Sequence, residues 1–459
     1  MDATPAERAS EARADTPVFV QGSTMRHVLV MTGTGAAGLI AIFIVDLVSL
    51  LYISWLHDPS MTAGVGLATV VMFFTVSINV GLMIPIGALV SRALGARRHE
   101  DARRLATSGS ILMVAIGAAV SLIVMPFLPQ ILKAMGASGQ AYQVAHSFLW
   151  IALPTNAMMA AGMAFSTLLR AAGDAKRSMY ATLSVAIITV FLDPVTIFVL
   201  DLRSDGAALT ISLARVVYLY VGYLYVTRTH RLLAKPSLQS VIRDARPFFA
   251  IAVPAVLTNL AAPAANAFFT GVMARFGDQA IAASAIIDRV TPVSFAGVFA
   301  LAGAIGPVLG QNWGAGRYDR MRATLKDSLT FMIVYVLSVW LLLFLLQEAI
   351  VLAFNAPPLT AELVRFFCQL SGFIWFFVSL VFVSNASFNN LGYPLLSTFF
   401  NWGRATLGMI PFAYFGAQIG GPKGALIGIG AGSIVFGIAA IVTAFWTIRR
   451  LERQAVPIP

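Results

Sequence analysis

The stretch IAIFIVDLVSLLYI, residues 40–53, places one carboxylate, Asp46, inside a long uncharged apolar run. A helix needs about 20 such residues to cross a bilayer, and this run is long enough. A charge at that depth is costly, so Asp46 is a candidate functional residue. Gly35, Gly38 and Ser49 share its helical face, which predicts contact with protein or water rather than lipid. A buried, hydrogen-bonded structural acid is the alternative.

The composition is that of a multi-pass membrane protein. Of the 459 residues, 58% are hydrophobic and 11% charged, and the mean hydropathy is +0.82, which no soluble protein of this size would show. The single cysteine, Cys368, excludes an internal disulfide and a cysteine metal cluster. The five histidines lack metal-ligand spacing, so we expect no metal and no cofactor. The net charge of +11 should be interpreted by its position relative to the membrane, not as nucleic-acid binding.

Twelve apolar runs are long enough to form spanning helices, which predicts an all-α membrane protein. They lie at 28–56, 63–91, 105–132, 141–169, 178–200, 206–227, 247–275, 280–310, 325–353, 361–388, 394–416 and 423–448. The expected parts are a disordered cytosolic tail (1–24), an N-terminal six-helix lobe (25–227), a cytosolic linker (228–246), a C-terminal six-helix lobe (247–450) and a cytosolic tail (451–459).

The distribution of basic residues predicts the topology. Most of the 31 Lys and Arg residues lie in the two tails and in the loops after the second, fourth, sixth and eighth runs. Because cytoplasmic loops carry the excess of Lys and Arg, both termini are expected in the cytosol of a cytoplasmic (inner) membrane.

The second half of the chain repeats the first. RALGARRHEDAR aligns with NWGAGRYDRMR so that Gly95 falls on Gly314, and LLRAAGDAK aligns with SFNNLGYPL so that Gly173 falls on Gly392. Both offsets are 219 residues. A repeat of six helices gives two bundles of the same orientation, with a substrate path expected between them.

A second acid, Asp193, lies in the fifth run. Thr189, Asp193 and Thr196 form a polar stripe on one helical face, and Pro194 follows the acid directly. A proline there removes a ladder hydrogen bond and leaves a backbone oxygen beside the carboxylate, a combination that can coordinate a proton or a sodium ion. Asp46 lies at a similar depth, so the two acids are expected to share one chamber. An ordinary proline kink with a capped aspartate is the alternative.

The second half offers a different set of polar residues: Asp288, Arg289, Asn259, Asn266 and Asn385. An adjacent Asp–Arg pair is more often a structural charge pair than a site. The asparagines are able to hydrogen-bond a substrate, although interhelical packing is their commoner role.

Motifs of enzymatic chemistry do not fit their context. GTGAAG, residues 33–38, matches a dinucleotide-binding pattern but lies within an apolar span without a preceding strand. The chain has no phosphate-binding P-loop, and no nucleophile–base pair lies at membrane depth. We therefore expect a transporter and not an enzyme.

The paired motifs RALGARR and GQNWGAGRYDR, with LRAAGD and LDP, resemble the multidrug and toxic compound extrusion (MATE) family. The resemblance implies two six-helix bundles forming a V, and export of cationic or amphipathic compounds in exchange for protons or sodium ions. It matches Asp46 and Asp193 to the family's aspartates in helices one and five, and Arg289 to a frequent arginine in helix eight. Ser49, Ser166, Thr189, Thr196 and Pro194 would be the supporting residues of the N-terminal lobe.

Two departures from the family pattern bear on the coupling ion. Many relatives have asparagine where this chain has Ser166, and helices seven and ten lack the acids that the sodium-coupled branch uses there. We therefore favour proton coupling. The implied partners are a small-molecule substrate and the lipid bilayer, with no nucleic acid, in a monomer. A lipid-linked precursor flippase of the same superfamily is the alternative, and would need a strongly cationic cavity.

Overall fold

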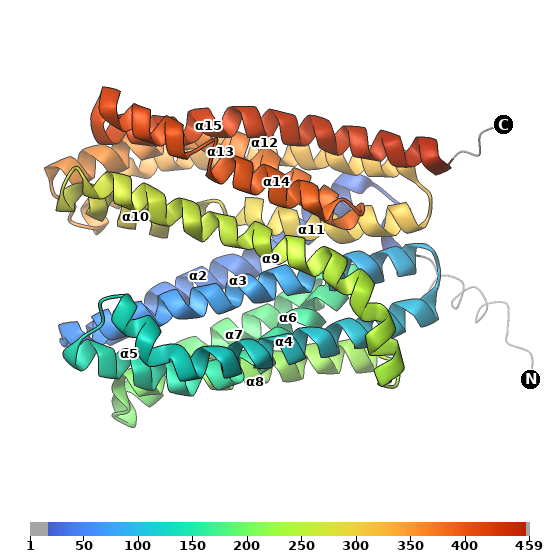
Figure 1. Cartoon of the computed structure of the whole chain (residues 1–459), viewed down its shortest axis with the longest axis horizontal. Coiled ribbons are helices and arrows are strands. Elements are labelled where there is room, and N and C mark those ends of the chain that lie inside the picture. The colour runs from blue at the N-terminus through green and yellow to red at the C-terminus, as the bar shows by residue number, and fades with distance from the viewer. Residues whose placement is uncertain (1–16, 456–459) are drawn as a thin grey trace, which may run out of the picture.

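The computed structural model describes residues 17–455, which are helical with no strand among them. The helices are η1 (Val18–Val20), α2 (Thr24–Ser54), α3 (Pro59–Gly95), α4 (His99–Ala134), α5 (Gly139–Ala152), η2 (Leu153–Thr155), α6 (Asn156–Ala171), α7 (Ala175–Pro194), η3 (Val195–Val199), α8 (Arg203–Leu224), η4 (Tyr225–Thr229), α9 (Leu238–Ala274), α10 (Asp278–Ser294), α11 (Ala296–Gly314), α12 (Tyr318–Ala353), α13 (Pro358–Asn390), α14 (Pro394–Ala405) and α15 (Ile410–Ala455). The N-terminal half (blue to green) and the C-terminal half (yellow to red) form two bundles side by side (Figure 1).

The described helices make twelve crossings, as the apolar runs predicted. Ten helices are long and apolar enough to span a membrane, and α10 with α11 forms an eleventh span bent by 46°. The last candidate, Pro394–Ala455, has non-helical backbone at Gly420 and Gly421 and doubles back there. Gly416 meets Gly424 on the returning arm, so this segment is an antiparallel pair of spans.

The internal repeat is visible in the backbone. Positive φ angles, which few L-residues adopt, occur at Arg97 and Gly316 (57° and 69°) and at Gly173 and Gly392 (86° and 82°). The members of each pair are 219 residues apart. The duplication predicted from the sequence is therefore confirmed in its turns.

The two halves meet where the ends of α3 and α11 cross. A Cβ atom on Gly95 would lie 2.0 Å from the carbonyl oxygen of Gln311, and one on Gly314 would lie 2.1 Å from that of Arg92. The two contacts are equivalent under the repeat, because Gly95 corresponds to Gly314 and Arg92 to Gln311. The glycines of RALG and NWG therefore allow the two backbones to touch across the pseudo-twofold axis.

Two hydrogen bonds repeat this symmetry. Arg92 Nη2 donates to the carbonyl of Asn390 at 3.0 Å, and Gln311 Nε2 donates to that of Ala171 at 2.7 Å. Both the donors and the acceptors are 219 residues apart. The Arg92 guanidinium also stacks on Trp313, 3.4 Å from its ring centroid. We call this end of the molecule, around the α3–α11 crossing, the closed face.

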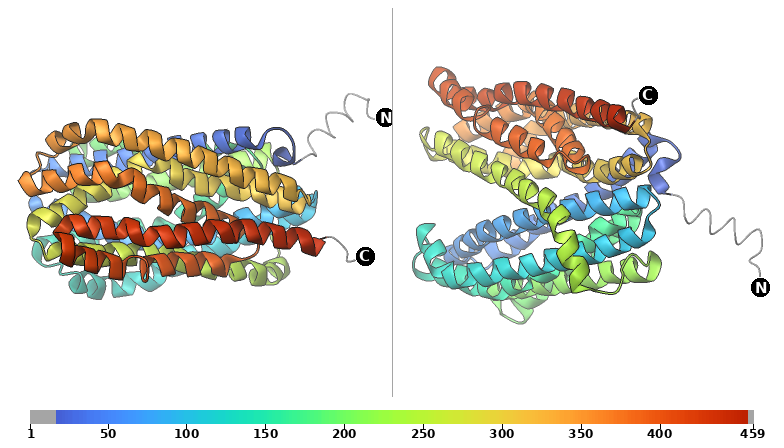
Figure 2. Two further views of the ribbon diagram at one scale, coloured as in Figure 1. Left: turned by 90° about the horizontal axis from the view of Figure 1, so that it is seen from above. Right: turned by 45° about the vertical axis from the view of Figure 1, so that its right-hand side comes forward.

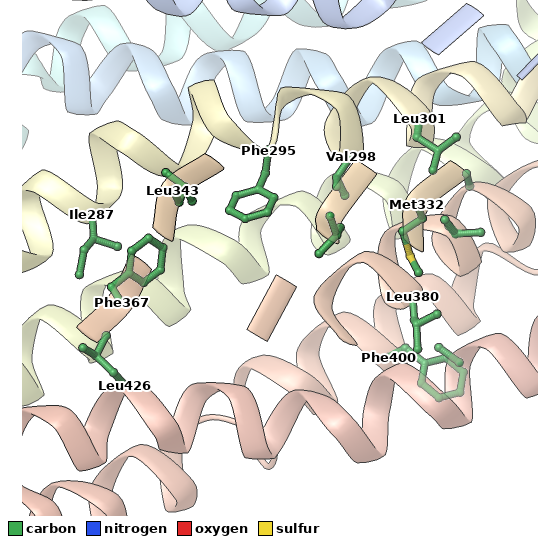
Figure 3. Packing of buried hydrophobic residues seen from close by; sticks show 14 of the residues in the cluster. Ile287, Phe295, Val298, Leu301, Met332, Leu343, Phe367, Leu380, Phe400 and Leu426 are labelled. Atoms are coloured by element: carbon green, nitrogen blue, oxygen red, sulfur yellow. The ribbon is translucent and has the colours of Figure 1, made fainter. Parts of the chain in front are cut away.

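The bundles separate away from the closed face. Figure 2 (right) shows their ribbons closest at the end that carries both termini and diverging toward the opposite end, which is the V that the family resemblance implies. Within the C-terminal half, side chains from α10 to α15 point into one core (Figure 3). Phe295 in this core stacks on Trp375 with centroids 4.5 Å apart.

Helix α9 belongs to both halves, which corrects the predicted boundary between them. The predicted linker 228–246 is mostly helical, because η4 ends at Thr229 and α9 begins at Leu238. Phe248 of α9 packs in the core of the N-terminal half, whereas Met273 packs in that of the C-terminal half. An apolar helix satisfies either core, so its sequence does not reveal the exchange.

The predicted tails also need correction. Residues 1–16 and 456–459 lie outside the described part, but 17–24 are ordered and α15 continues to Ala455. Phe19 is 1% exposed and packs against both halves, beside Met31 and Val308. Its N–H donates to Gln311 Oε1 at 3.0 Å. One buried aromatic and its backbone bonds are enough to order this segment.

The α3–α11 crossing yields a prediction about stability. Gly95→Ala should destabilise the protein by about 1–3 kcal/mol, because the new methyl group overlaps a backbone carbonyl. Gly33→Ala is the matched control, since a Cβ there has no neighbour within 4 Å. Thermal unfolding of the purified variants in detergent measures both, and equal melting temperatures would contradict the packing described here.

Candidate functional site

Asp193 lies at the end of α7 with its side chain buried, 1% of the residue being exposed. Ser49 Oγ on α2 donates a hydrogen bond to Oδ2. The other oxygen, Oδ1, is buried without a hydrogen-bond partner among the described residues. A buried carboxylate oxygen without a donor is costly, and binding a proton or a cation would offset that cost.

The helix changes its winding directly after this acid. Beyond Pro194 the chain continues as a single π-helical stretch, Val195–Val199. Such π turns are a known cause of local helix distortion and are frequent at functional sites. Thr196 Oγ1 lies 2.8 Å from Thr210 Oγ1 on α8, which ties the distorted turn to its neighbour. Thr189 is buried but bonds the Val185 carbonyl of its own helix at 2.9 Å.

Asp46 lies one turn before Ser49 on α2, and its side chain is exposed. Among residues 17–455 it has neither a hydrogen bond nor an ion pair. Gly35, eleven residues earlier, packs against Ala300 of α11, because a Cβ atom on Gly35 would lie 3.3 Å from the Ala300 methyl carbon. Eleven residues are slightly more than three helical turns, so Asp46 points to nearly the same side as Gly35, toward the other bundle. Leu47, 40% exposed, points elsewhere.

The two acids do not contact each other directly, but α2 carries both Asp46 and the serine that bonds Asp193. No hydrogen bond joins Asp46 to Asp193 in the described chain. Ser49, one turn after Asp46 on α2, is the residue that bonds Asp193 on α7. Ser49, predicted only as a supporting polar residue, bonds Asp193 directly. A single chamber shared by both acids stays a prediction.

Ser166 lies in a different cluster. Its hydroxyl is 2.8 Å from that of Ser178, and Arg170 Nη1 donates to both, at 3.2 and 3.1 Å. The motif LLRAAG contains this arginine four residues after Ser166, a helical spacing from which the contact was predictable. Ser166 therefore supports a buried arginine and does not contact Asp193.

The candidate charges of the C-terminal half do not form a pair. Asp288 and Arg289 are both exposed on α10, and neither has an ion pair among residues 17–455. Successive side chains on a helix point about 100° apart, so adjacency in sequence does not bring them together. The structural charge pair that their adjacency indicated is absent from the described chain.

The three asparagines differ in their availability. Asn259 Nδ2 donates to the Ala255 carbonyl on its own helix at 2.8 Å. Asn266 is exposed, and Asn385 has a buried Oδ1 without a partner in the described residues. Asn266 and Asn385 have no side-chain hydrogen bond among the described residues, whereas Asn259 has the bond to its own helix.

The sequence reasoning missed a polar contact at the closed face. Asp174, in the turn before α7, lies 2.8 Å from His230 Nε2 and 2.5 Å from Arg177 Nη1. Burial raises the pKa of this carboxyl, but its bonds from His230 and Arg177 outweigh that effect and hold the pKa below the usual range. The contact joins the turn after α6 to the segment after α8.

These features together define a class of protein. Two repeated six-helix bundles that meet at one end, with an unpaired carboxylate on the side of one bundle that faces the other, are the architecture of a secondary transporter. The profile of the MatE family matches residues 36–195 and 254–415, one segment in each half. The chain belongs to this family, whose members are transporters and not enzymes.

Known relatives agree with this assignment. The chain is 25% identical over 429 residues to a FAD transporter of Shewanella oneidensis, covering 91% of this chain and 94% of the relative. It is 23% identical over 336 residues to the multidrug export protein MepA of Staphylococcus aureus, covering 72% and 73%. The MATE transporter VcmN of Vibrio cholerae, solved as a point mutant, has a similar structure, with a TM-score of 0.89, 21% identity and coverage of 94% and 99%.

The bond from Ser49 to Asp193 yields a second prediction. Ser49→Ala removes the serine hydroxyl that donates to the buried Asp193 carboxylate, which should cost about 1–3 kcal/mol. Ser54→Ala is the matched control on the same helix, because Ser54 is exposed and bonds only the Leu51 carbonyl, at 2.7 Å. Unfolding midpoints at neutral pH measure the difference. Indistinguishable midpoints for the two variants would show that the bond does not stabilise the site.

Proposed function

We propose that this protein exports cationic or amphipathic compounds in exchange for protons, with Asp46 and Asp193 as the residues that bind the proton and the cation in turn. The observation that carries the proposal is Asp46, an unpaired carboxylate on the α11-facing side of α2, one turn from the serine that bonds buried Asp193. The multidrug export protein MepA among the relatives supports drug-like cargo.

Competition for negative charge explains the exchange. A cationic compound is attracted by ionised Asp46, and protonation of the acids removes that attraction, so proton and substrate binding oppose each other. Because α2 holds Asp193 through Ser49, a change of protonation is transmitted to α7 at the distorted turn after Pro194. Loading from the opposite side of the membrane then requires the α3–α11 crossing to separate.

We also propose that the closed face is cytosolic, that both termini lie there, and that the protein works as a monomer in the inner membrane. The basic residues Arg97, Arg98 and Arg317 in the turns after α3 and α11 support this orientation under the positive-inside rule. The described state would then be open away from the cytosol, ready to release its cargo.

The proton gradient supplies enough energy for export. One proton moved across about 150 mV provides roughly 3.5 kcal/mol. At 1.36 kcal/mol per tenfold change, this supports about a 300-fold concentration gradient of substrate.

A second candidate cargo is an anionic nucleotide such as FAD. The FAD transporter matches most of this chain, and Arg289 is an exposed cation without an ion pair in the described residues. The acids on α2 and α7 favour cations instead. A lipid-linked precursor flippase would need a cationic cavity, and the unpaired Arg289 alone does not provide one.

Export from cells of a panel of fluorescent cations and of flavins tests the proposal. Asp46→Asn and Asp193→Asn should each abolish cation export, because asparagine keeps the size of the side chain but binds no proton. Asp288→Asn is the control and should retain most of the activity. Export should stop when the proton gradient is collapsed and continue when only the sodium gradient is.

Three outcomes would contradict the proposal. Sodium-driven export in a proton-permeable membrane would exclude proton coupling. Equal loss of export in all three variants would contradict the specific role of the two acids in the N-terminal half. Export of flavins but not of cations would show that the cargo is an anionic compound such as FAD.

A further inference from the structure

A hollow opens on the closed face beside the α3–α11 crossing. Its volume is about 160 Å³, and its walls come from the end of α3 and the start of α4. It is lined by Leu89, Arg92, Ala93, Arg98, Asp101, Arg104 and Leu105. Three guanidinium groups and one carboxylate therefore share a space with an apolar wall. We call it the Arg92 hollow.

Only one of the three arginines is fully engaged with acids. Arg104 contacts Asp101 at 2.5 Å and Asp244 at 3.1 Å. Arg98 has only a 3.8 Å ion pair with Asp101, and 62% of its side chain is exposed. Arg92 donates one hydrogen bond, to the Asn390 carbonyl, and its buried Nε has no acceptor among the described residues. Unused donors of two arginines therefore remain at this hollow.

At the corresponding place in the C-terminal half, the surface is covered by the N-terminal segment. The residues 219 positions after Arg92 and Asp101 are Gln311 and Arg320. Arg320 donates to the carbonyls of Gly22 and Phe19, each at 2.9 Å, and Gln311 accepts from the Phe19 N–H. In the C-terminal half the N-terminal segment thus covers the corresponding surface through bonds to Gln311 and Arg320. In the Arg92 hollow no segment of the described chain supplies acceptors to Arg92 Nε and Arg98.

We propose that the Arg92 hollow binds a phosphate group, supplied by the headgroup of an anionic phospholipid. Guanidinium groups are the preferred partners of phosphate, because their planar donors match its oxygens. The hollow lies at the ends of spanning helices, the depth at which headgroups are found, and Leu89 and Leu105 form its apolar wall. The proposal does not depend on the exported compound or on the coupling ion.

Binding of a phosphate group in the Arg92 hollow would stabilise the state in which the two halves meet at the closed face. Arg92 crosses to the other half, where it bonds Asn390 and stacks on Trp313. A phosphate on its free donors holds the guanidinium in that position, and a ligand that binds one state better shifts the population toward it. Anionic lipid is therefore a ligand of the state described here.

Native mass spectrometry of the delipidated, detergent-purified protein tests the proposal. Phosphatidylglycerol and phosphatidylcholine are titrated separately, and inorganic phosphate is added in a third arm. Arg98→Gln is the test variant. Arg317→Gln is its matched control, because Arg317 is the repeat equivalent, exposed, and bonded to Asp319 at 3.0 Å.

Phosphatidylglycerol should be retained in preference to phosphatidylcholine by the wild type and by Arg317→Gln. Its affinity should fall about fivefold in Arg98→Gln, the value for one basic side chain at an anionic surface. Phosphatidylglycerol binding unchanged by Arg98→Gln, or equal retention of both lipids, would overturn the proposal. Binding of inorganic phosphate without any preference for phosphatidylglycerol would assign the hollow to a soluble anion and also overturn it.

Discussion

The structure depends on one steric constraint, the crossing of α3 and α11 with no room for a Cβ atom at Gly95 or Gly314. Backbone contact at this point lets Arg92 and Gln311 each reach a carbonyl of the other half. The N-terminal segment then binds over Gln311, and the bundles diverge only beyond this end. Because the contact is made by backbone atoms, it has no soft side chain to yield, and it favours two discrete arrangements over gradual opening.

Helix α2 connects this crossing to the acids. Near the closed face Gly35 packs on α11, and Gly38 packs on Thr182 of α7, with a Cβ there 3.2 Å from its methyl carbon. Further along, Ser49 bonds Asp193, and Asp46 points toward the other bundle. One helix thus contacts both halves and carries the carboxylate that we propose to bind the proton. A movement of either half therefore changes the surroundings of Asp46.

Much of this arrangement was predictable from the sequence, because helical periodicity and the 219-residue repeat are strong signals. The spans and the duplication follow from spacing alone. The exchange of α9 between the cores was not predictable, since an apolar helix suits either of them.

Other features needed three-dimensional context. Residues 17–24 are held by the burial of Phe19 between the halves and by hydrogen bonds from Arg320, contacts that the sequence does not reveal. The partner of Arg92 is a backbone carbonyl 298 residues away, which no local pattern indicates. The charge pair predicted for Asp288 and Arg289 is not found in the described residues, because adjacent side chains on a helix point apart.

We propose that protonation of Asp46 and Asp193 controls how the two halves meet at the closed face. Spin labels on Glu100 and Asp319, exposed residues of the two halves, would report their separation by double electron–electron resonance in a Cys368→Ala background. The account predicts that the distance distribution of the otherwise unmodified protein changes between pH 8 and pH 5, and that the Asp46→Asn/Asp193→Asn protein does not respond. The same pH-dependent change in both proteins would contradict it.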